Sequence, residues 1–306
     1  MKRIVSVSLG SSKRNASSST LILGEEVVVE RIGTDGSIDK AIAMIRELDG
    51  KVDAFGMGGI DLYLYAGGRR YAFRTAKLIA AAAQKTPIVD GSGLKNTLER
   101  RVVQYIDKHV MPIRGKKVLM PSALDRFGMA ETFVAAGSDI LFGDVMFGLG
   151  INLPIRKIST LNTLAHILLP VVTQLPFKWL YPTGEKQDQR IEKYPAAYEW
   201  ADIIAGDAHY ILRHMPKRLD GKLILTNTIT KENVVELRER GVGMLVTTTP
   251  NLGGRSFGTN VMEGLIVAAA GKHQQELTAA DYEAWLDKIG FVPRVEHLGA
   301  IGSTGD

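Results

Sequence analysis

The fold is decided by residues 114–149, which read RGKKVLMPSALDRFGMAETFVAAGSDILFGDVMFGL. A short apolar run at 118–120 follows two lysines, and a polar turn comes next. Residues 127–136 have the composition of a helix that Gly137 ends, and a second apolar run starts at Ile140. Strand, turn, helix and strand in this order make a β-α-β unit, from which parallel sheets are built.

The alternation of strand and helix continues on both sides of this unit. Apolar runs predict strands at 2–9, 20–23, 25–32, 52–55, 87–89, 203–205, 222–225 and 244–246. Helical spacing, with capping residues such as Ser37, Thr230 and Thr278, predicts helices at 38–48, 74–84, 94–109, 231–240, 261–270 and 279–289. We therefore predict an α/β protein, doubly wound, with two Rossmann-like parallel-sheet domains.

The boundary between these domains is expected at 112–115, where a new β-α-β series starts. Residues 1–113 are then an N-terminal α/β domain, which we expect to be the substrate domain. Residues 114–298 form a Rossmann-like domain with a crossover helix at 158–180 and C-terminal helices. The last residues, 299–306, have the composition of a disordered tail.

Composition and charge narrow the class of protein. The chain has 306 residues, of which 45% are hydrophobic and 23% charged, as in soluble globular proteins. Its basic residues are scattered, which disfavours nucleic-acid binding, and the net charge of +5 suits a small anionic partner. The absence of cysteine excludes disulfides, thiolate zinc sites and a cysteine nucleophile. The first residues are expected to form a strand and not a signal peptide, so we expect a cytoplasmic protein.

Residues 153–182 are rich in apolar side chains but are interrupted by charged ones, so a membrane span is not expected. One interpretation is a crossover helix that packs on the other domain or on a second subunit, which predicts a homo-oligomer. Peripheral contact with a membrane is the less favoured alternative.

Polar, glycine-rich loops follow the predicted strands. The carboxyl ends of parallel strands share one edge of a sheet, where ligands bind. This edge is predicted to carry residues 56–61, 90–95, 121–126, 143–144, 206–209, 226–228 and 247–260.

Residues 90–96, DGSGLKN, are the most informative of these loops. Two glycines allow close approach of a ligand, and the following helix start and Lys95 favour an anion. An ordinary strand-to-helix turn capped by Ser92 is an equal alternative. The spacing of a P-loop is absent. Two further glycines, Gly58 and Gly59, precede Asp61 in a loop for which a tight turn is the favoured interpretation.

Residues 247–260, TTTPNLGGRSFGTN, offer a second group of candidates. The planar guanidinium of Arg255 suits a carboxylate or phosphate, Thr248 lies in the same loop, and Asn260 either contacts a ligand or caps the next helix. Candidates for acid–base chemistry are Asp61, Asp90, Lys95, Asp125, Asp144, Asp207 and His209. The six histidines lack metal-ligand spacing, so no metal site held by protein side chains alone is predicted.

The unit at 114–149 resembles the start of the cofactor domain of shikimate/quinate 5-dehydrogenases, in which a G-K-x-V-L strand opens the nucleotide-binding half. Residues 201–204, ADII, and 247–250, TTTP, are similar to a later strand and to the N-T-T-P loop of that family. The stretches DGSGLKNTLER and TPNLGGRSFGTN are similar to those of bacterial chains labelled quinate 5-dehydrogenase-like.

The resemblance implies an oxidoreductase that acts on a small hydroxylated carboxylate with NAD or NADP. Under this interpretation the strand-exit loops supply the site residues. The expected catalytic residues are Lys95, Asp90 and His209. The expected cofactor contacts are Ser122, Asp125, Gly143 and Asp144. The expected substrate contacts are Gly58, Gly59, Asp61, Ser92, Thr248, Arg255 and Asn260.

The chain departs from that family at the glycine-rich loop, which residues 120–125 replace with MPSALD. Asp125 repels a pyrophosphate there, and Asp144 suits a ribose hydroxyl better than a 2′-phosphate. Two alternatives therefore stay open. The protein is either a binding or regulatory protein that has lost the cofactor, or a transferase that uses a phosphorylated or nucleotide-activated donor.

Overall fold

The structure is a computed structural model that describes residues 1–176, 190–227, 229–249, 251–252, 255–256 and 258–299, with the backbone alone at 251, 252, 255 and 256. It divides into two compact units. Unit 1 comprises Met1–Leu98, Ala165–Gln187 and Phe257–Phe291, and unit 2 comprises Glu99–Leu164, Asp188–Ser256 and Val292–Asp306. Both units are discontinuous in sequence, whereas the prediction was of two continuous domains, 1–113 and 114–298.

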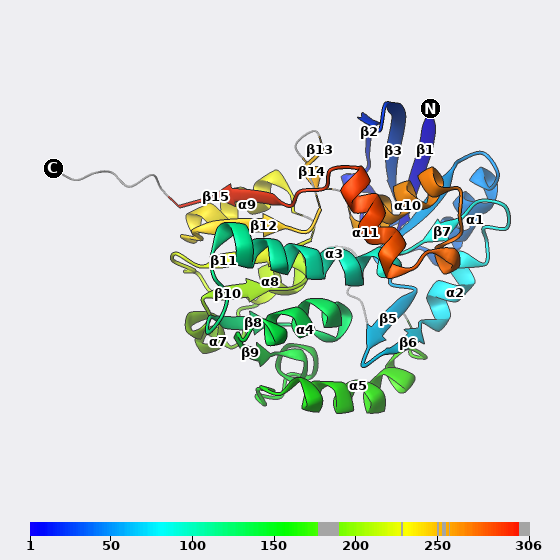
Figure 1. Cartoon of the computed structure of the whole chain (residues 1–306). Coiled ribbons are helices and arrows are strands. Elements are labelled where there is room, and N and C mark those ends of the chain that lie inside the picture. The colour runs from blue at the N-terminus through cyan, green and yellow to red at the C-terminus, as the bar shows by residue number, and fades with distance from the viewer. Residues whose placement is uncertain (177–189, 228, 250, 253–254, 257, 300–306) are drawn as a thin grey trace. The chain divides into compact units, whose positions relative to one another are not determined.

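Unit 1 is built on a five-stranded sheet of order β2-β3-β1-β4-β7 (Figure 1). Strand β2 is antiparallel to β3, and the other neighbours are parallel. The strands are β1 (Lys2–Ser8), β2 (Ala16–Ile22), β3 (Glu25–Gly33), β4 (Ala54–Gly58) and β7 (Ile88–Val89), with a separate hairpin of β5 (Tyr63–Ala66) and β6 (Arg69–Ala72). The helices are η1 (Ser12–Arg14), α1 (Ile38–Leu48), α2 (Arg74–Ala80), α10 (Thr259–Ala270), η6 (Gln274–Glu276), α11 (Ala279–Lys288) and the start of α3 (Ser92–Tyr105).

Local sequence explains the helices of unit 1. The Ser37 side chain accepts the Lys40 N–H at 3.2 Å and starts α1, which buries Ala41 and Ile45. Helix α10 lies against β1, β4 and β7. It does so because Gly264 has no side chain: a Cβ there would lie 3.1 Å from Cγ2 of Ile4.

Unit 2 is built on a six-stranded sheet of order β15-β12-β11-β10-β8-β9, in which only β15 is antiparallel to its neighbour. The strands are β8 (Lys117–Met120), β9 (Asp139–Phe142), β10 (Ile203–Ala205), β11 (Leu223–Thr226), β12 (Met244–Thr247) and β15 (Arg294–His297), with a small ladder of β13 (Asn251–Leu252) and β14 (Arg255–Ser256). The helices are the end of α3, η2 (Ile106–Val110), η3 (Leu124–Arg126), α4 (Phe127–Ala135), η4 (Asp144–Gly148), α7 (Pro195–Trp200), α8 (Ala208–His214) and α9 (Lys231–Glu239). Helix α5 (Ile158–Val172) begins in unit 2 and belongs to unit 1 from Ala165 onward.

The order of these strands creates a switch point. From β8 the chain passes to β9 on one side and returns to β10 on the other, so the chain winds in opposite directions on the two sides of β8. The switch point therefore lies between the carboxyl ends of β8 and β10, which is where open α/β sheets bind ligands. The predicted doubly wound fold with two parallel-sheet units is confirmed.

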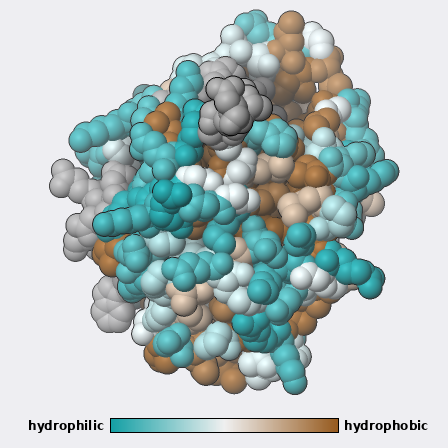
Figure 2. Space-filling model, turned by 90° about the vertical axis from the view of Figure 1, so that its left-hand side faces the viewer, coloured by the Kyte–Doolittle hydropathy of each residue, from teal (hydrophilic) through white to brown (hydrophobic). Residues whose placement is uncertain are grey.

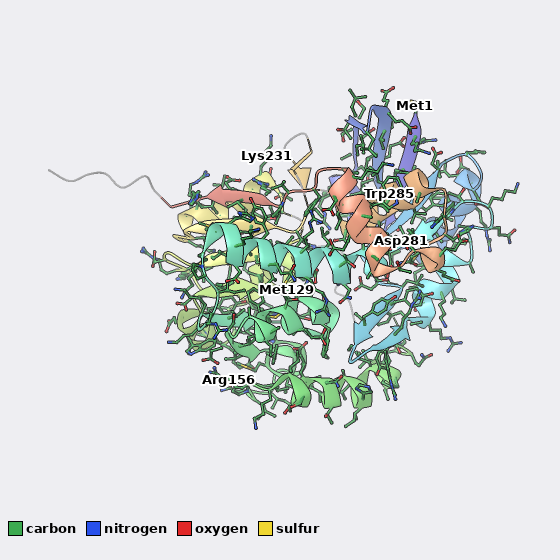
Figure 3. The ribbon with its side chains drawn as sticks, in the orientation of Figure 1. Met1, Met129, Arg156, Lys231, Asp281 and Trp285 are labelled. Carbon is green, nitrogen blue, oxygen red and sulfur yellow. The ribbon has the colours of Figure 1, made fainter. Side chains whose placement is uncertain are left out.

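The core and the surface follow the expected division of side chains. Met129 of α4 is fully buried, whereas Lys231, at the start of α9, and Arg156 are exposed (Figure 3). Figure 2 shows hydrophilic and apolar residues interspersed over the face in view. Helix α5 buries Leu161, Ala165 and Leu169 on one side.

Three local predictions were wrong. The predicted crossover helix at 158–180 ends at Val172 as α5, shortly after Pro170, and residues 177–180 lie outside the described residues. The strand predicted at 20–23 begins earlier, at Ala16, as β2, because residues 16–22 pair with β3. The hairpin β5–β6 was missed altogether. No helix of the described part is long and apolar enough to cross a bilayer.

Candidate functional site

The candidate site of unit 2 lies at the carboxyl edge of its sheet, and its central residue is Asp144, which begins η4 immediately beyond β9. Its Oδ1 accepts the backbone N–H groups of Ala123 and Leu124, each at 2.9 Å. Its Oδ2 is buried and has no hydrogen-bond partner within the described part of the chain. Burial is the main reason that the pKa of Asp144 is raised to about 7, and the nearby Asp125 carboxylate contributes to the rise. The two backbone hydrogen bonds act in the opposite direction and lower the pKa.

Two more carboxylates lie at the same edge. Asp125 accepts the Ser122 hydroxyl at 2.8 Å. Asp207 caps α8, because its Oδ1 accepts the His209 N–H at 2.9 Å, and its Oδ2 accepts the amide of Asn227 at 3.0 Å. Both side chains are held in place by the chain itself, so the acidic lining is built before any ligand arrives.

Arg126 is a buried cation at this edge, and it is surrounded by acids. Its side chain is 3% exposed and pairs with the buried Glu99. Its other nitrogens lie 3.2 Å from Asp207 and 3.6 Å from Asp125. Its positive charge is therefore shared among internal carboxylates, which a buried guanidinium requires.

Tyr210 adds a hydroxyl donor to the group. Partial burial, together with the carboxylates of Asp125, Asp207 and Asp144, raises the pKa of Tyr210 to about 12. The phenol therefore keeps its proton at neutral pH. The carboxyl edge of unit 2 therefore combines the acceptor oxygens of Asp125 and Asp207, the donor hydroxyl of Tyr210 and the carboxyl group of Asp144, whose pKa is about 7.

These residues do not fit the pyrophosphate of a dinucleotide in its usual position. That position needs free backbone N–H groups and glycines after the first strand. Here the N–H groups of Ala123 and Leu124 are bound to Asp144, and neighbouring acids repel a second anion. Gly143 serves packing, since a Cβ there would lie 2.5 Å from the Phe147 ring.

The predicted acid–base residue Asp90 lies in unit 1 and is occupied by internal donors. Its Oδ2 accepts the N–H groups of Leu62 at 2.5 Å and Tyr63 at 3.1 Å. Its Oδ1 accepts the N–H of Ser92 at 3.0 Å and the Ser92 hydroxyl at 2.7 Å. The structure thus brings Asp90 and Ser92 together in a capped turn. Lys95 follows in the first turn of α3 and is half-buried, and its catalytic role stays a prediction.

Among the other predicted substrate contacts of unit 1, Asn260 joins α10 to the sheet. Its amide donates to the Ser6 hydroxyl at 2.8 Å. Helix α10 begins at Thr259 with Gly258 as its cap, so the alternative prediction of Asn260 as the cap was wrong. Gly58 packs on Ser8, because a Cβ there would lie 3.0 Å from that of Ser8, and Gly59 has a left-handed φ of +70°.

The remaining predicted residues lie in both units. Asp61 is half-buried in unit 1, and His209 is exposed in the first turn of α8. Thr248 is fully buried, and its backbone N–H donates to Thr226 at 2.8 Å. The side chain of Arg255 lies outside the described residues. Within the described chain, no three acidic or histidine side chains gather where they could hold a metal ion.

Sequence reasoning missed Glu263, a fully buried carboxyl group of α10. It accepts the Gly91 N–H at 2.7 Å, the Gln274 amide at 3.0 Å and the Tyr282 hydroxyl at 2.6 Å. Burial raises its pKa to about 7, and the Asp90 carboxylate adds to the rise. A single acid within the apolar run VMEGLIVAAA was the signal that could have found it.

Comparison with family models gives two matches. One, described as a domain of unknown function, DUF8754, matches residues 93–298, and a second, described as a domain of unknown function, DUF8753, matches residues 3–90. The chain belongs to the DUF8754 family. The comparison with curated proteins gives no match.

Solved structures give distant likenesses to this DUF8754 member. A hetero-hexameric glutamate dehydrogenase from Thermus thermophilus is 10% identical over 94% of this chain and 73% of its own, with a TM-score of 0.43. A sugar ABC transport substrate-binding protein from Bordetella parapertussis is 13% identical over 88% of this chain and 79% of its own, with a TM-score of 0.34.

A third likeness is to an NAD-dependent malic enzyme from Thermotoga maritima, which is 10% identical over 80% of this chain, with a TM-score of 0.32. The chain spans 65% of the length of that enzyme. The three are two dehydrogenases and a sugar-binding protein, and TM-scores this low do not choose between them.

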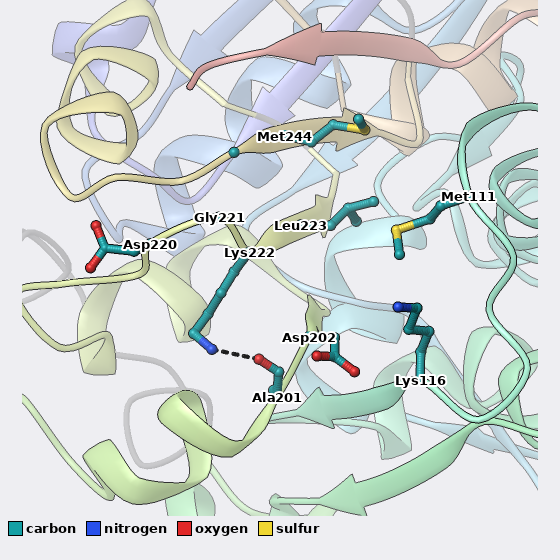
Figure 4. Close-up of a pocket in the computed structure, with 10 residues that line it drawn as sticks. Met111, Lys116, Ala201, Asp202, Asp220, Gly221, Lys222, Leu223 and Met244 are labelled. Carbon is teal, nitrogen blue, oxygen red and sulfur yellow. Dashed lines mark hydrogen bonds between the residues drawn. The ribbon is translucent and has the colours of Figure 1, made fainter. Parts of the chain in front are cut away.

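A hollow in unit 2 of the DUF8754 member lies on the opposite edge of its sheet. Its volume is about 380 Å³ (Figure 4). Residues that directly precede or begin β8, β10, β11 and β12 line it, so it lies at the amino ends of these strands. The lining residues are Met111, Lys116, Ala201, Asp202, Asp220, Gly221, Lys222, Leu223, Gly243 and Met244. Sequence analysis, which considered strand exits alone, did not point to this edge.

Proposed function

We propose that the protein is an enzyme that transfers a proton to or from a small hydroxylated molecule at the carboxyl edge of the unit 2 sheet, with Asp144 as the acid and base. The observation that carries the proposal is the state of Asp144. Two backbone donors hold its Oδ1, and its Oδ2 is buried without a partner within the described residues. The unpartnered oxygen is the atom that would carry the exchanged proton.

The pKa of Asp144 supports this role. A carboxyl group with a pKa of about 7 is divided between acid and carboxylate at neutral pH, which is the condition for efficient proton transfer in both directions. Ordinary exposed aspartates are almost fully ionised there and are poor acids. Burial has therefore moved Asp144 into the range in which catalytic carboxyl groups operate.

The neighbours of Asp144 indicate the substrate class. Asp125 and Asp207 offer acceptors for hydroxyl or ammonium groups, and Tyr210 offers a donor. Three acids, Glu99, Asp125 and Asp207, surround the guanidinium of Arg126, so an anion is disfavoured beside it. The proposed substrate is a neutral polyhydroxylated or basic molecule, in contrast to the small anionic partner expected from the net charge.

The second candidate is the oxidoreductase of shikimate/quinate dehydrogenase type, with NAD or NADP. One observation favours it: Asp144 follows the second strand of the unit, where dinucleotide-binding domains place an acid for the adenine ribose. A carboxylate there would select NAD against NADP. The bonds from Ala123 and Leu124 to Asp144 argue against it, because they occupy the donors that a pyrophosphate needs.

Calorimetric titration separates the candidates. Quinate, shikimate, myo-inositol, glucosamine, NAD and NADP are titrated at pH 7 in two buffers that differ in ionisation enthalpy, which reveals protons exchanged on binding. A neutral or basic compound should bind wild type with proton exchange, and Asp144→Asn should abolish the exchange. Asp139→Asn is the matched control and should behave as wild type. It changes an exposed carboxylate at the start of β9, the strand that Asp144 follows.

The alternatives give different results. Tight binding of NAD to wild type, weakened in Asp144→Asn, would favour the oxidoreductase. Proton exchange that persists unchanged in Asp144→Asn would assign the titrating group elsewhere and reject the proposed role of Asp144.

A further inference from the structure

The hollow at the amino edge of unit 2 has an internal arrangement of charge that the proposed function does not use. Lys116 and Asp202 both line it. Neither forms an ion pair with the other in the described part of the chain, although they carry opposite charges and face the same space. Figure 4 shows the Lys116 side chain extending past the Asp202 carboxylate toward Met111.

Each charge is fixed by the backbone around it. Asp202 accepts the Lys117 N–H through Oδ2 at 2.9 Å, and its Oδ1 accepts no hydrogen bond from the described residues. The backbone N–H of Asp202 donates to Lys117 at 2.8 Å, and its carbonyl accepts from Leu223 at 3.1 Å. The half-buried Lys116 is anchored by its N–H bond to Ile113 at 3.1 Å.

The other charged side chains of the lining are already satisfied. Lys222 donates to the carbonyls of Ala201 at 2.6 Å and Glu199 at 2.9 Å, and burial lowers its pKa. Asp220 is bound through both oxygens by Arg218. The rest of the lining is apolar or thioether, from Met111, Leu223 and Met244. One cation, one anion and an apolar wall therefore remain for a ligand.

We propose that this hollow binds a small zwitterion with an apolar side chain, that is, an α-amino acid. Its carboxylate pairs with Lys116, its ammonium pairs with Asp202, and its side chain lies against Met111, Leu223 and Met244. A volume of about 380 Å³ is within the range of small-molecule sites. Thioether side chains adapt to different aliphatic shapes, so the site selects the zwitterion more strongly than the side chain.

Calorimetry with three related probes tests the proposal. L-norleucine carries both charges, n-pentylamine lacks the carboxylate, and hexanoate lacks the ammonium. Norleucine should bind wild type about tenfold or more tightly than either analogue, because each lost charge removes a charge-assisted hydrogen bond.

Two variants extend the test. Lys116→Gln should reduce the affinity for norleucine to that of pentylamine, and should leave the affinity for pentylamine unchanged. Asp202→Asn should reduce the affinity for norleucine to that of hexanoate, and should leave the affinity for hexanoate unchanged. The amide oxygen of the new side chain can still accept the Lys117 N–H.

Controls keep the outcome interpretable. Arg114→Gln, an exposed cation of the same loop outside the lining, should bind norleucine as wild type does. Met111→Trp fills the hollow and should abolish binding while circular dichroism shows a folded protein. Absence of norleucine binding to folded wild type overturns the proposal, and so does a Lys116→Gln variant that weakens all three probes equally. Asp144→Asn should bind norleucine normally, which separates this site from the proposed catalytic one.

Discussion

Glu263 in unit 1 and Asp144 in unit 2 are carboxyl groups whose pKa burial raises to about 7, yet they have opposite surroundings. Glu263 has donors on both oxygens, from Gly91, Gln274 and Tyr282. Asp144 has donors on one oxygen alone within the described chain. A raised pKa therefore does not by itself identify a catalytic group. The unpartnered oxygen distinguishes a carboxyl group that can act on a ligand from one that holds the fold together.

The largest effect is expected from Glu263→Ala. This change leaves the buried partners of Glu263 without an acceptor, so the free energy of unfolding should fall by about 3–4 kcal/mol. Urea denaturation followed by tryptophan fluorescence measures it. Glu47→Ala, at an exposed glutamate of α1, should change the stability by less than about 0.5 kcal/mol. A Glu263→Ala variant as stable as that control would show that the network has no structural role.

Gly93→Ala should have the next largest effect. A Cβ at this position would overlap Oε1 of Glu263 and lie 2.7 Å from the Tyr282 hydroxyl. Both neighbours are buried and held by hydrogen bonds, so the overlap should cost about 2 kcal/mol of stability. The same denaturation experiment measures it. An unchanged free energy of unfolding would mean that Glu263 and Tyr282 move aside without cost. Glu263 would then not be rigidly held, and its contrast with Asp144 would be weaker.

The third largest effect is expected from the titration of Glu263, which makes the free energy of unfolding depend on pH. Glu263 has a higher pKa in the folded state, about 7, than its ordinary value of 4.5, so folding favours its protonated form. Its contribution to stability is complete below pH 4.5 and is lost as the pH rises through 7. Between pH 6 and pH 8 this loss should be about 1–2 kcal/mol. Glu263→Gln should be less stable than wild type but should show a flatter pH profile, and an unchanged slope would assign the titration to another group.

The smallest effect on stability is expected from Asp144→Asn. The amide oxygen can still accept the N–H groups of Ala123 and Leu124, so the free energy of unfolding should change by about 1 kcal/mol or less. Thermal unfolding at pH 6 provides the measurement. A loss as large as that of Glu263→Ala would make Asp144 a structural residue and would remove the distinction between the two carboxyl groups.

Sequence reasoning succeeded where the determinants are local. Helix α1 has the predicted bounds, Ile38–Leu48, because its cap and its apolar face lie within a dozen residues. It failed at the hairpin β5–β6, although the Gly67–Gly68 pair, with φ of +56° and +73°, was a local signal for the turn. The carboxyl group of Asp144 was found because it follows a strand, but its bonds to Ala123 and Leu124 depend on how β8 and β9 pair.

Long-range polar contacts were beyond the sequence. Gly91 and Glu263 are 172 residues apart, and no periodicity connects them. Asp90 looked catalytic for the same reason that it caps a turn: short acids bind nearby backbone N–H groups as readily as they bind ligands. The composition of a loop shows that donors and acceptors are present, and the tertiary structure decides whether they are already used.

The return of α10 to the first sheet has a consequence for how the chain is made. Strands β1, β4 and β7 lie within the first 89 residues, but the helix that covers them is Thr259–Ala270. A ribosome adds about 5–20 residues per second, so this sheet waits for its cover until nearly the whole chain has emerged. The amino-terminal strands must therefore stay protected from aggregation during synthesis, and a nascent chain halted before residue 259 is the species in which a chaperone would find them exposed.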